Sequence, residues 1–504
     1  MFHFHAKLIA AYRIVLERNN ILEGELKVKT KRKNLMLFLC SLITIYMFTG
    51  CSLTRSGVAN NSVLSNNSSE GITELSKGRL DSLEKIEIGG IEQWIYMTSN
   101  DISKPVLLFL HGGPGYTMLP ILHEYNRELE DHFLVVNWDQ RGAGLSYSGD
   151  IPDDSMTLKQ FVSDLHELTD YLKTRFKKKK IFIVGHSFGT LVGIKAISEY
   201  PEDYYAFASV GQFVNFAENE QFSYDFALKS AQENHNSKAI KQLTSVGRPN
   251  GSGRYYDDSG YEITLRWMEY YGGDIYGETS TEKLEDEIAY SDLYKGYREK
   301  IENGYEFSDL LFEDEEVLNV NLKEQIKSVN VPIYFLQGRH DNDTPSKLVE
   351  EYFNILSAPK KELIWFENSA HFPFYEESDK FSKALIEKVL PVAQNGIIGK
   401  WAGSYTTDQV TNTAELNVAR ETDGRLSAEF SFHSSDNTIE GKYKMTVFYN
   451  PENGSITLSG QEWIERPSQY QMVNLVGSAT NDKIEGSVTL SDNATVLGEF
   501  HLKK

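Results

Sequence analysis

The stretch of residues 181–190 constrains the fold of this chain more than any other. Ile181–Val184 is an unbroken run of β-branched and aromatic residues, which is typical of a strand buried on both faces. Gly185-His-Ser-Phe-Gly189 follows directly, and a helix is expected over about residues 188–200. The two glycines permit a strained turn that lifts the serine above the sheet edge. Because glycine and serine are common, this pattern alone is a weak signal, and a catalytic serine needs partners elsewhere in the chain.

Strands and helices alternate on both sides of this stretch. A long helix is expected over residues 157–176, where apolar residues recur near helical spacing. Two strand-like runs joined by Gly89-Gly90 indicate a hairpin near the start of the folded region. Buried strands are expected at residues 106–110, 133–137, 207–210, 331–336 and 362–366. This alternation predicts a mostly parallel sheet with helices on both faces, within residues 76–395.

The chain changes character twice more towards its C-terminus. Residues 212–325 are rich in Tyr and Glu and contain no evident buried strand, so we expect a helical insertion there. The expected helices are 222–234, 237–245, 262–270 and 282–290, with a final helix of the α/β region at 377–390. Residues 396–504 contain short alternating strands with turn signals. They predict a separate all-β domain, either a barrel or a sandwich.

The N-terminal segment carries a targeting pattern. A basic run at residues 27–33, an apolar run at 35–48 and Thr49-Gly50-Cys51 together resemble a bacterial lipoprotein signal, in which the cysteine is lipidated. The apolar run is short for a bilayer span, and an uncleaved signal anchor is the alternative. Residues 51–75 have the Asn- and Ser-rich composition of a flexible tether. We therefore expect residues 1–50 to direct the protein to the extracytoplasmic face of a bacterial cell membrane, where the lipid on Cys51 anchors it.

Charge and cysteine content narrow the functional classes. The formal net charge of −21 argues against nucleic-acid binding, which needs clustered Lys and Arg. The two cysteines, Cys40 and Cys51, both precede the folded part, so neither a disulfide framework nor a cysteine metal site is expected. No motif points to a metal or an organic cofactor, and no feature indicates the oligomeric state.

Two residues at later strand ends supply the partners that Ser187 needs. Asp341 follows one expected buried strand, and His371 follows the last one. The order serine, acid, histidine is that of α/β-hydrolases, in which the histidine takes the serine proton and the acid orients the imidazole. Asp343 is the competing acid, but Asp341 lies directly in the turn after its strand. The three positions together predict nucleophilic catalysis by Ser187.

Two backbone N–H groups are expected to form an oxyanion hole for this serine. Phe188 is one expected donor, because it follows Ser187 at the N-terminus of a helix. The other is expected in the glycine-rich loop His111-Gly-Gly-Pro-Gly115, which follows a buried strand. Gly113 is the expected donor in this loop, and Gly112 is the alternative.

Five motifs in one order resemble the proline iminopeptidase family of α/β-hydrolases. They are His111-Gly-Gly-Pro-Gly115, Trp138-Asp-Gln-Arg-Gly142, Gly185-His-Ser-Phe-Gly189, Gly338-Arg-His-Asp341 and Ala370-His-Phe-Pro373. The resemblance covers residues 80–395 and implies that the helical insertion at 212–325 caps the site. It also implies an α/β-hydrolase fold and release of an N-terminal residue, typically proline, from short peptides.

The resemblance also assigns roles to individual residues. Ser187, Asp341 and His371 match the catalytic triad of the family. Asp139 and Arg141 match a turn of the family and are expected to support the oxyanion loop through an ion pair.

The resemblance leaves substrate binding less determined than the triad. Family members that release proline hold the free amine with cap glutamates in an aromatic-rich motif, which has no clear equivalent here. The candidates for amine binding are the cap residues Glu218, Glu220 and Glu269. Since fold does not fix the substrate, an esterase, lactonase or amidase acting on a small acyl substrate is the alternative to a peptidase. A non-enzymatic surface-binding protein that works through its β domain is a third hypothesis, which the complete triad argues against.

Overall fold

The computed structural model describes residues 78–504, except residues 258, 422–424, 437, 452, 469 and 481. The described residues belong to one compact unit, Thr73–Lys504. The predicted signal, the tether and Cys51 lie outside the described residues and stay predictions. Within the described part of the chain, no helix is both long enough and apolar enough to cross a membrane.

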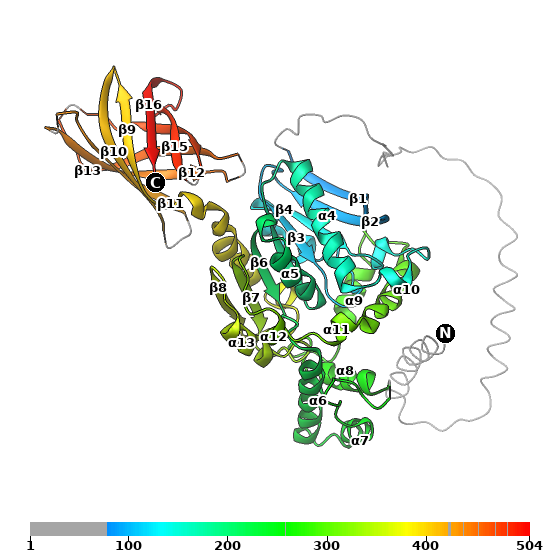
Figure 1. Cartoon of the computed structure of the whole chain (residues 1–504). Coiled ribbons are helices and arrows are strands. Elements are labelled where there is room, and N and C mark those ends of the chain that lie inside the picture. The colour runs from blue at the N-terminus through cyan, green and yellow to red at the C-terminus, as the bar shows by residue number, and fades with distance from the viewer. Residues whose placement is uncertain are drawn as a thin grey trace, which may run out of the picture. The chain divides into compact units, whose positions relative to one another are not determined.

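An eight-stranded sheet lies at the centre of the α/β region (Figure 1). Its spatial order is β1-β2-β4-β3-β5-β6-β7-β8, and only β2 runs antiparallel to its neighbours. The strands are β1 Leu80–Ile88, β2 Ile91–Ser99, β3 Val106–Leu110, β4 Leu134–Asp139, β5 Ile181–His186, β6 Tyr204–Val210, β7 Ile333–Gly338 and β8 Lys361–Phe366. The predicted, mostly parallel sheet is therefore confirmed. Loops at the carboxyl ends of parallel strands meet at one edge of the sheet, where ligands bind in open α/β folds.

The sheet separates two apolar cores, one on each face. In β5, Ile181 and Ile183 join one core, whereas Phe182 and Val184 join the other, as the alternation of side chains in a strand requires. The helices α4, α5 and α13 contribute to the first core, and α3, α14 and α15 contribute to the second. Their bounds are α3 Ile121–Tyr125, α4 Leu158–Phe176, α5 Phe188–Glu199, α13 Ser346–Ile355, α14 Pro373–Glu376 and α15 Ser378–Ala384.

The segment predicted as one α-helix at 377–390 changes helical type along its length. After α15 it continues as a π-helix at Leu385–Val389 and as a 3-10 helix at Leu390–Ile397. Pro391 provides the physical reason, because it has no N–H to donate to a carbonyl one turn earlier. The prediction of a continuous α-helix was therefore wrong at its C-terminal end.

Seven α-helices and one 3-10 helix, Asp309–Glu313, are described between β6 and β7, where a helical insertion was predicted. The α-helices are α6 Phe216–Glu233, α7 Ser237–Val246, α8 Ser259–Tyr270, α9 Glu282–Ala289, α10 Arg298–Ser308, α11 Glu315–Leu318 and α12 Leu322–Gln325. Figure 1 shows α6, α7 and α8 side by side, and they share an apolar cluster that is separate from the two cores of the sheet. The sequence did not predict α10, whose Gly304 packs so closely that a Cβ there would lie 2.7 Å from the Gly142 carbonyl oxygen.

The C-terminal region is a closed, eight-stranded antiparallel barrel, which decides between the two predicted all-β architectures. Each strand pairs with the next, and the last pairs with the first. The strands are β9 Gly399–Thr407, β10 Val410–Arg420, β11 Leu426–His433, β12 Glu440–Tyr449, β13 Ser455–Glu465, β14 Asn474–Ala479, β15 Lys483–Thr489 and β16 Val496–Lys503. Large side chains such as Trp401, Phe430 and Tyr443 are buried in one apolar cluster of this barrel.

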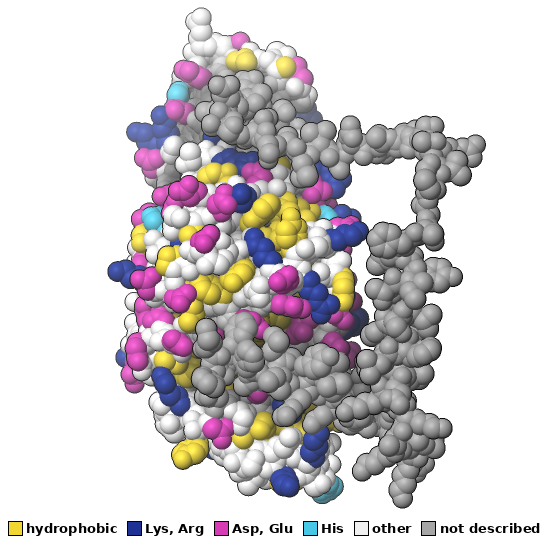
Figure 2. All heavy atoms as spheres, turned by 90° about the vertical axis from the view of Figure 1, so that its right-hand side faces the viewer, with side chains coloured by type: hydrophobic (Ala, Val, Ile, Leu, Met, Phe, Trp, Pro, Cys, Tyr) yellow, Lys and Arg dark blue, Asp and Glu magenta, His cyan; other side chains and the backbone are white. Residues whose placement is uncertain are grey.

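One face of the described part of the chain has a surface of mixed character. On the face drawn in Figure 2, small groups of acidic and basic side chains alternate with apolar ones.

Candidate active site

Ser187 lies in the tight turn between β5 and α5, as predicted. Its backbone angles are φ 52° and ψ −121°, a strained conformation for a residue with a side chain. The Ser187 N–H donates to the carbonyl oxygen of Val210 in β6 over 3.0 Å, which ties the turn to the neighbouring strand. A Cβ at Gly189 would overlap the carbonyl oxygen of Leu110 at the end of β3, so α5 approaches β3 this closely only because residue 189 is glycine. Backbone packing therefore fixes the position of Ser187.

The glycine-rich loop after β3 lies directly against Ser187. A Cβ at Gly112 would be 2.8 Å from the Cβ of Ser187. Gln140 anchors the loop, since its backbone N–H donates to Nε2 of His111 over 3.1 Å and its side-chain amide donates to the His111 carbonyl over 2.9 Å. Burial lowers the pKa of His111 to about 4, so at neutral pH the ring is uncharged and able to accept. The predicted roles of Gly113 and Phe188 as oxyanion donors require this closeness of loop and serine.

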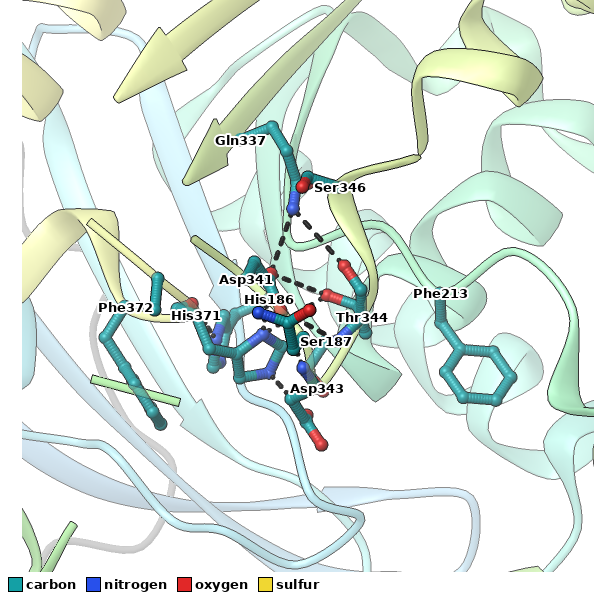
Figure 3. Close-up of polar contacts among 12 residues, drawn as sticks. His186, Ser187, Phe213, Gln337, Asp341, Asp343, Thr344, Ser346, His371 and Phe372 are labelled. Atoms are coloured by element: carbon teal, nitrogen blue, oxygen red, sulfur yellow. Dashed lines mark hydrogen bonds and ion pairs between the residues drawn. The ribbon is translucent and has the colours of Figure 1, made fainter. Parts of the chain in front are cut away.

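Asp341 and His371 are brought together as an acid–base pair. Nδ1 of His371 lies 3.0 Å from Oδ2 of Asp341, and both side chains are buried. Oδ1 of Asp341 accepts from the backbone N–H groups of Asp343 and Thr344, and Oδ2 accepts from the Thr344 hydroxyl and the Gln337 side chain (Figure 3). These donors fix the carboxylate, and Nδ1 of His371 therefore carries a proton towards it. No sequence pattern pointed to Gln337 or Thr344.

The second ring nitrogen of His371 contacts a different carboxylate. Nε2 lies 3.0 Å from Oδ2 of Asp343, whose side chain is 30% exposed (Figure 3). Within the described residues, Ser187 makes no hydrogen bond to His371, so Asp343 holds the nitrogen that a serine nucleophile uses as its base. Burial lowers the pKa of His371, but the carboxylates of Asp341 and Asp343 outweigh this and raise it to about 10. In this state the imidazole is a cation between two carboxylates.

His186 positions the backbone of His371. Nε2 of His186 lies 2.9 Å from the His371 carbonyl oxygen, and the two ring centroids are 4.5 Å apart. Burial, followed by the neighbouring charge of His371, holds the pKa of His186 well below its usual range, so the ring is neutral and donates from Nε2. Because His186 directly precedes Ser187, it links the serine turn to the loop that carries the base.

A third carboxyl group, Asp274, reaches the same place from the loop between α8 and α9. The backbone N–H of His371 donates to the Asp274 carbonyl over 2.8 Å, and the Asn342 N–H donates to the Gly273 carbonyl over 2.9 Å. The side chain of Asp274 is buried, and burial, with the nearby charge of Asp343, raises its pKa well above the usual range. No sequence pattern pointed to Asp274, because only the packing of the insertion against the sheet brings it to His371.

The three glutamates predicted as amine-binding candidates differ in their surroundings. Glu218 forms an ion pair with Lys323 at 2.7 Å and is partly exposed, so it has another partner. Glu220 is buried, and burial, followed by the charge of Asp343, raises its pKa to about 8. Glu269 is partly buried, and its charge contributes to the raised pKa of Asp274. Glu220 and Glu269 are thus near the His371 site.

The predicted ion pair between Asp139 and Arg141 was wrong. Arg141 donates to both carboxylate oxygens of Asp164 in α4, over 2.8 and 3.0 Å, and both side chains are buried. Asp139 accepts from the hydroxyls of Thr117 and Tyr294 and from the backbone N–H of Leu145. Asp139 is the last residue of β4, whereas Arg141, two residues later, points towards α4. The turn does support the oxyanion loop, but through the bonds of Gln140 described above.

Several known proteins are similar to this chain. A probable aminopeptidase of Bacillus subtilis (strain 168), YbaC, is 32% identical over 306 residues, which are 60% of this chain and 94% of that protein. A proline iminopeptidase of Clostridium botulinum is 26% identical over 294 residues, 56% of this chain and 89% of that protein. The crystal structure of a proline iminopeptidase from Mycobacterium smegmatis is 16% identical, with a TM-score of 0.45, over 61% of this chain and 97% of that one. The sequence model of the family described as alpha/beta hydrolase fold matches residues 105–378, and the chain belongs to that family.

Proposed function

We propose that this hydrolase releases N-terminal residues from short peptides through an acyl-enzyme on Ser187. The observation that carries the proposal is the group of carboxyl side chains around His371, namely Asp343 at 3.0 Å, Asp274 within the same cluster, and Glu220 and Glu269 nearby. An N-terminal residue presents a cationic amine beside its reacting carbonyl, and carboxylates are the natural partners of such a cation. The aminopeptidase and iminopeptidase names of the similar proteins support the same substrate class.

In the proposed mechanism, the hydroxyl of Ser187 attacks the carbonyl carbon of the N-terminal residue and transfers its proton to Nε2 of His371. Asp341 stabilises the imidazolium through Nδ1. The N–H groups of Gly113 and Phe188 bind the oxyanion of the tetrahedral intermediate. His371 then protonates the leaving amine. In the second half of the reaction, His371 takes a proton from the attacking water and afterwards returns it to Ser187, which releases the product acid.

The position of Asp343 suits an amine subsite. In an aminoacyl group the amine nitrogen lies only about 2.5 Å from the carbonyl carbon, so its partner has to be close to both Ser187 and His371. Asp343 meets the second part of this condition, because its carboxylate contacts Nε2 of His371. An ammonium that pairs with Asp343 draws the carboxylate away from Nε2 and so lowers the pKa of His371. Once the Nε2 proton has passed to solvent, this nitrogen can accept the proton of Ser187. Glu218 is a weaker candidate, because Lys323 already neutralises it.

One observation favours the alternative of an esterase or amidase that acts on neutral acyl groups. Burial raises the pKa of Glu220 to about 8 and that of Asp274 well above its usual range, so both side chains hold protons more tightly than ordinary carboxyls. A protonated carboxyl group can donate a hydrogen bond to a carbonyl or ether oxygen of an uncharged substrate. The two substrate classes are therefore separated by the charge of the group beside the scissile carbonyl.

A matched set of substrates tests this proposal. The full chain is assayed with prolyl and other aminoacyl arylamides, with the same arylamides after N-acetylation, and with short acyl esters. The aminopeptidase proposal predicts kcat/KM at least about tenfold higher for the free amines, equal to about 1.4 kcal/mol of transition-state stabilisation. Ser187→Ala is the control for contaminating peptidases. Equal rates for free and acetylated amines, or cleavage of esters alone, would reject the aminopeptidase assignment in favour of the alternative.

We also propose that the mature protein is anchored to the extracytoplasmic face of a bacterial membrane by a lipid on Cys51. This rests on the order of a basic run, an apolar run and a cysteine that follows Thr49-Gly50. An uncleaved signal anchor would give the same location without the lipid. Replacement of Cys51 by serine separates the two, because only the lipid anchor needs the cysteine.

A further inference from the structure

We propose that His371, Asp343 and Asp274 form a binding site for a divalent metal ion, specifically Zn²⁺, and that zinc bound there reversibly blocks the histidine. This inference goes beyond the proposed peptidase activity and does not depend on it. It concerns an inhibitory ion, which takes no part in the reaction.

The geometry of three donor atoms is the first observation. One ligand atom from each of the three residues lies within 4.8 Å of the other two. Nε2 of His371 and Oδ2 of Asp343 are 3.0 Å apart. Two ligands of a tetrahedral zinc ion, each about 2.0–2.1 Å from the metal, are separated by about 3.3 Å. The His371–Asp343 edge therefore fits zinc with a shift of a few tenths of an ångström, and the ligand atom of Asp274 lies within 4.8 Å of both.

The state of Asp274 is the second, independent observation. Its side chain is only 7% exposed, and Oδ1 has no hydrogen-bond partner among the described residues. A buried carboxylate oxygen without a donor is costly, and a metal ion would satisfy it. The backbone bonds from His371 and Asn342 to the loop of Asp274 hold it in place. The site thus has one anchored ligand with an unused oxygen, and not merely a set of acidic residues.

The charge balance favours a cation at this place. Within the described part of the chain, no Lys or Arg forms an ion pair with Asp274 or Asp343. The charges that act on Asp274 are those of the acids Asp343, Glu269 and Asp341, opposed by the cationic ring of His371 alone. One imidazole and two carboxylates are ligand types that zinc accepts, and such three-ligand sites leave a fourth position open. Asp343 is 30% exposed, which leaves a path for the ion from solvent.

A second cluster of the same composition serves as a contrast. His166, Asp170 and Asp203 also place three ligand atoms within 4.8 Å of one another. There, however, Lys173 forms ion pairs with both aspartates, so its ammonium group already occupies the place of a cation. His166 lies outside the candidate active site. It therefore offers a matched histidine for substitution, and the proposal predicts no zinc effect from that cluster.

Zinc binding and catalysis use the same lone pair. The Nε2 lone pair that coordinates zinc is the one that accepts the proton of Ser187, and the proton that Nε2 shares with Asp343 passes to solvent when the ion binds. The histidine cannot act as a base while the metal is bound. A bound zinc ion also occupies the carboxylates proposed to receive the substrate amine, so zinc and substrate exclude each other.

The test combines metal binding with labelling of the nucleophile. The full chain is freed of metal with a chelator and titrated with Zn²⁺ by calorimetry, and with Co²⁺, whose visible absorption reports tetrahedral N/O coordination. The rate of labelling by a neutral fluorophosphonate is followed over the same Zn²⁺ range. We expect one ion per chain, loss of labelling in proportion to occupancy, and full recovery on addition of chelator.

The variants decide between this site and others. Asp274→Asn and Asp343→Asn should each weaken Zn²⁺ binding by at least about tenfold, since loss of even an outer partner of a metal ligand costs that much. Ser187→Ala should bind Co²⁺ and Zn²⁺ as the unmodified chain does, so binding remains measurable if the proposed hydrolysis fails. His166→Gln should leave both binding and inhibition unchanged. Unaltered zinc affinity in both aspartate variants, or its loss in His166→Gln, would overturn the proposal, and so would the lack of a stoichiometric ion.

Discussion

Replacement of Asp341 by asparagine gives the sharpest test of how the histidine is oriented. Oδ1 of Asp341 faces two backbone N–H donors, and Oδ2 faces the Gln337 amide, the Thr344 hydroxyl and Nδ1 of His371. The NH₂ group of asparagine replaces one of the two carboxylate oxygens, so it has to face one of these two sets of groups. Two backbone N–H groups cannot turn into acceptors, so the amide is expected at the Oδ2 position. There the Thr344 hydroxyl can accept by rotation, and His371 can accept by changing its tautomer.

The changed tautomer places the proton of neutral His371 on Nε2, where it can no longer accept the proton of Ser187. A histidine held in the wrong tautomer lowers kcat by about 10⁴, which corresponds to about 5 kcal/mol in the activation free energy. The measurement is the second-order rate of fluorophosphonate labelling, together with kcat on the best substrate found. Thermal unfolding checks that Asp341→Asn remains folded, because mismatched donors around the amide cost about 1–3 kcal/mol.

Asp343→Asn is the matched control, since it removes the carboxylate on Nε2 and leaves the bonds of Asp341 to His371 in place. Labelling by the neutral probe should stay within about tenfold of the unmodified rate, a difference of at most about 1.4 kcal/mol. The reasoning fails if Asp343→Asn loses labelling as severely as Asp341→Asn. It fails equally if Asp341→Asn keeps the full rate, because Asp343 would then be the orienting acid.

Three further predictions concern stability and location. Asp164→Asn leaves the buried Arg141 without its counter-ion and should lower the free energy of unfolding by about 3–5 kcal/mol, whereas a double-mutant cycle of Arg141 with Asp139 should show little coupling; urea unfolding checks both. Gly189→Ala drives a methyl group into the Leu110 carbonyl oxygen, so we expect poorly folded protein with reduced helix content by circular dichroism, while Ala at Gly149, which has open space around it, should be tolerated. Cys51→Ser should move the protein from the membrane fraction to the soluble or secreted fraction, and unchanged fractionation would favour the signal anchor.

The elements that the sequence predicted well are those determined by interactions between residues close together in the chain. Residues 106–110 and 181–184 are short apolar runs, and such runs become central strands of a parallel sheet wherever they occur in a βα alternation. The helix at residues 158–176 was predicted within one residue of its start. Its apolar stripe and its N-cap at Thr157 are both features of the local sequence. The positions of Ser187, Asp341 and His371 followed from strand ends, and the structure brings Asp341 and His371 together.

The parts that the sequence did not predict depend on long-range packing. Arg141 was paired with the wrong acid because its true partner, Asp164, lies on a helix that only the tertiary fold brings near. A signal was present, since Asp164 interrupts the apolar face formed by Phe161 and Leu165, and a buried carboxylate there needs a cation. Asp274 gave no such signal, because it lies in a loop of the insertion with no pattern around it. Asp343 was recognised as an acid, but its contact with the other ring nitrogen could not be read from spacing.

The separate apolar cluster shared by α6, α7 and α8 has a consequence for how proteins of this kind change over evolutionary time. This cluster does not merge with the cores of the sheet, so substitutions in it change the packing of these helices alone. The helices can therefore diverge without loosening the serine turn. The loop and turn that carry Gly112 and Gly189 have no such freedom. A side chain at Gly112 would meet Ser187, and one at Gly189 would meet the backbone of Leu110. New substrate preferences are therefore expected to arise in the insertion, with the chemistry inherited unchanged beneath it.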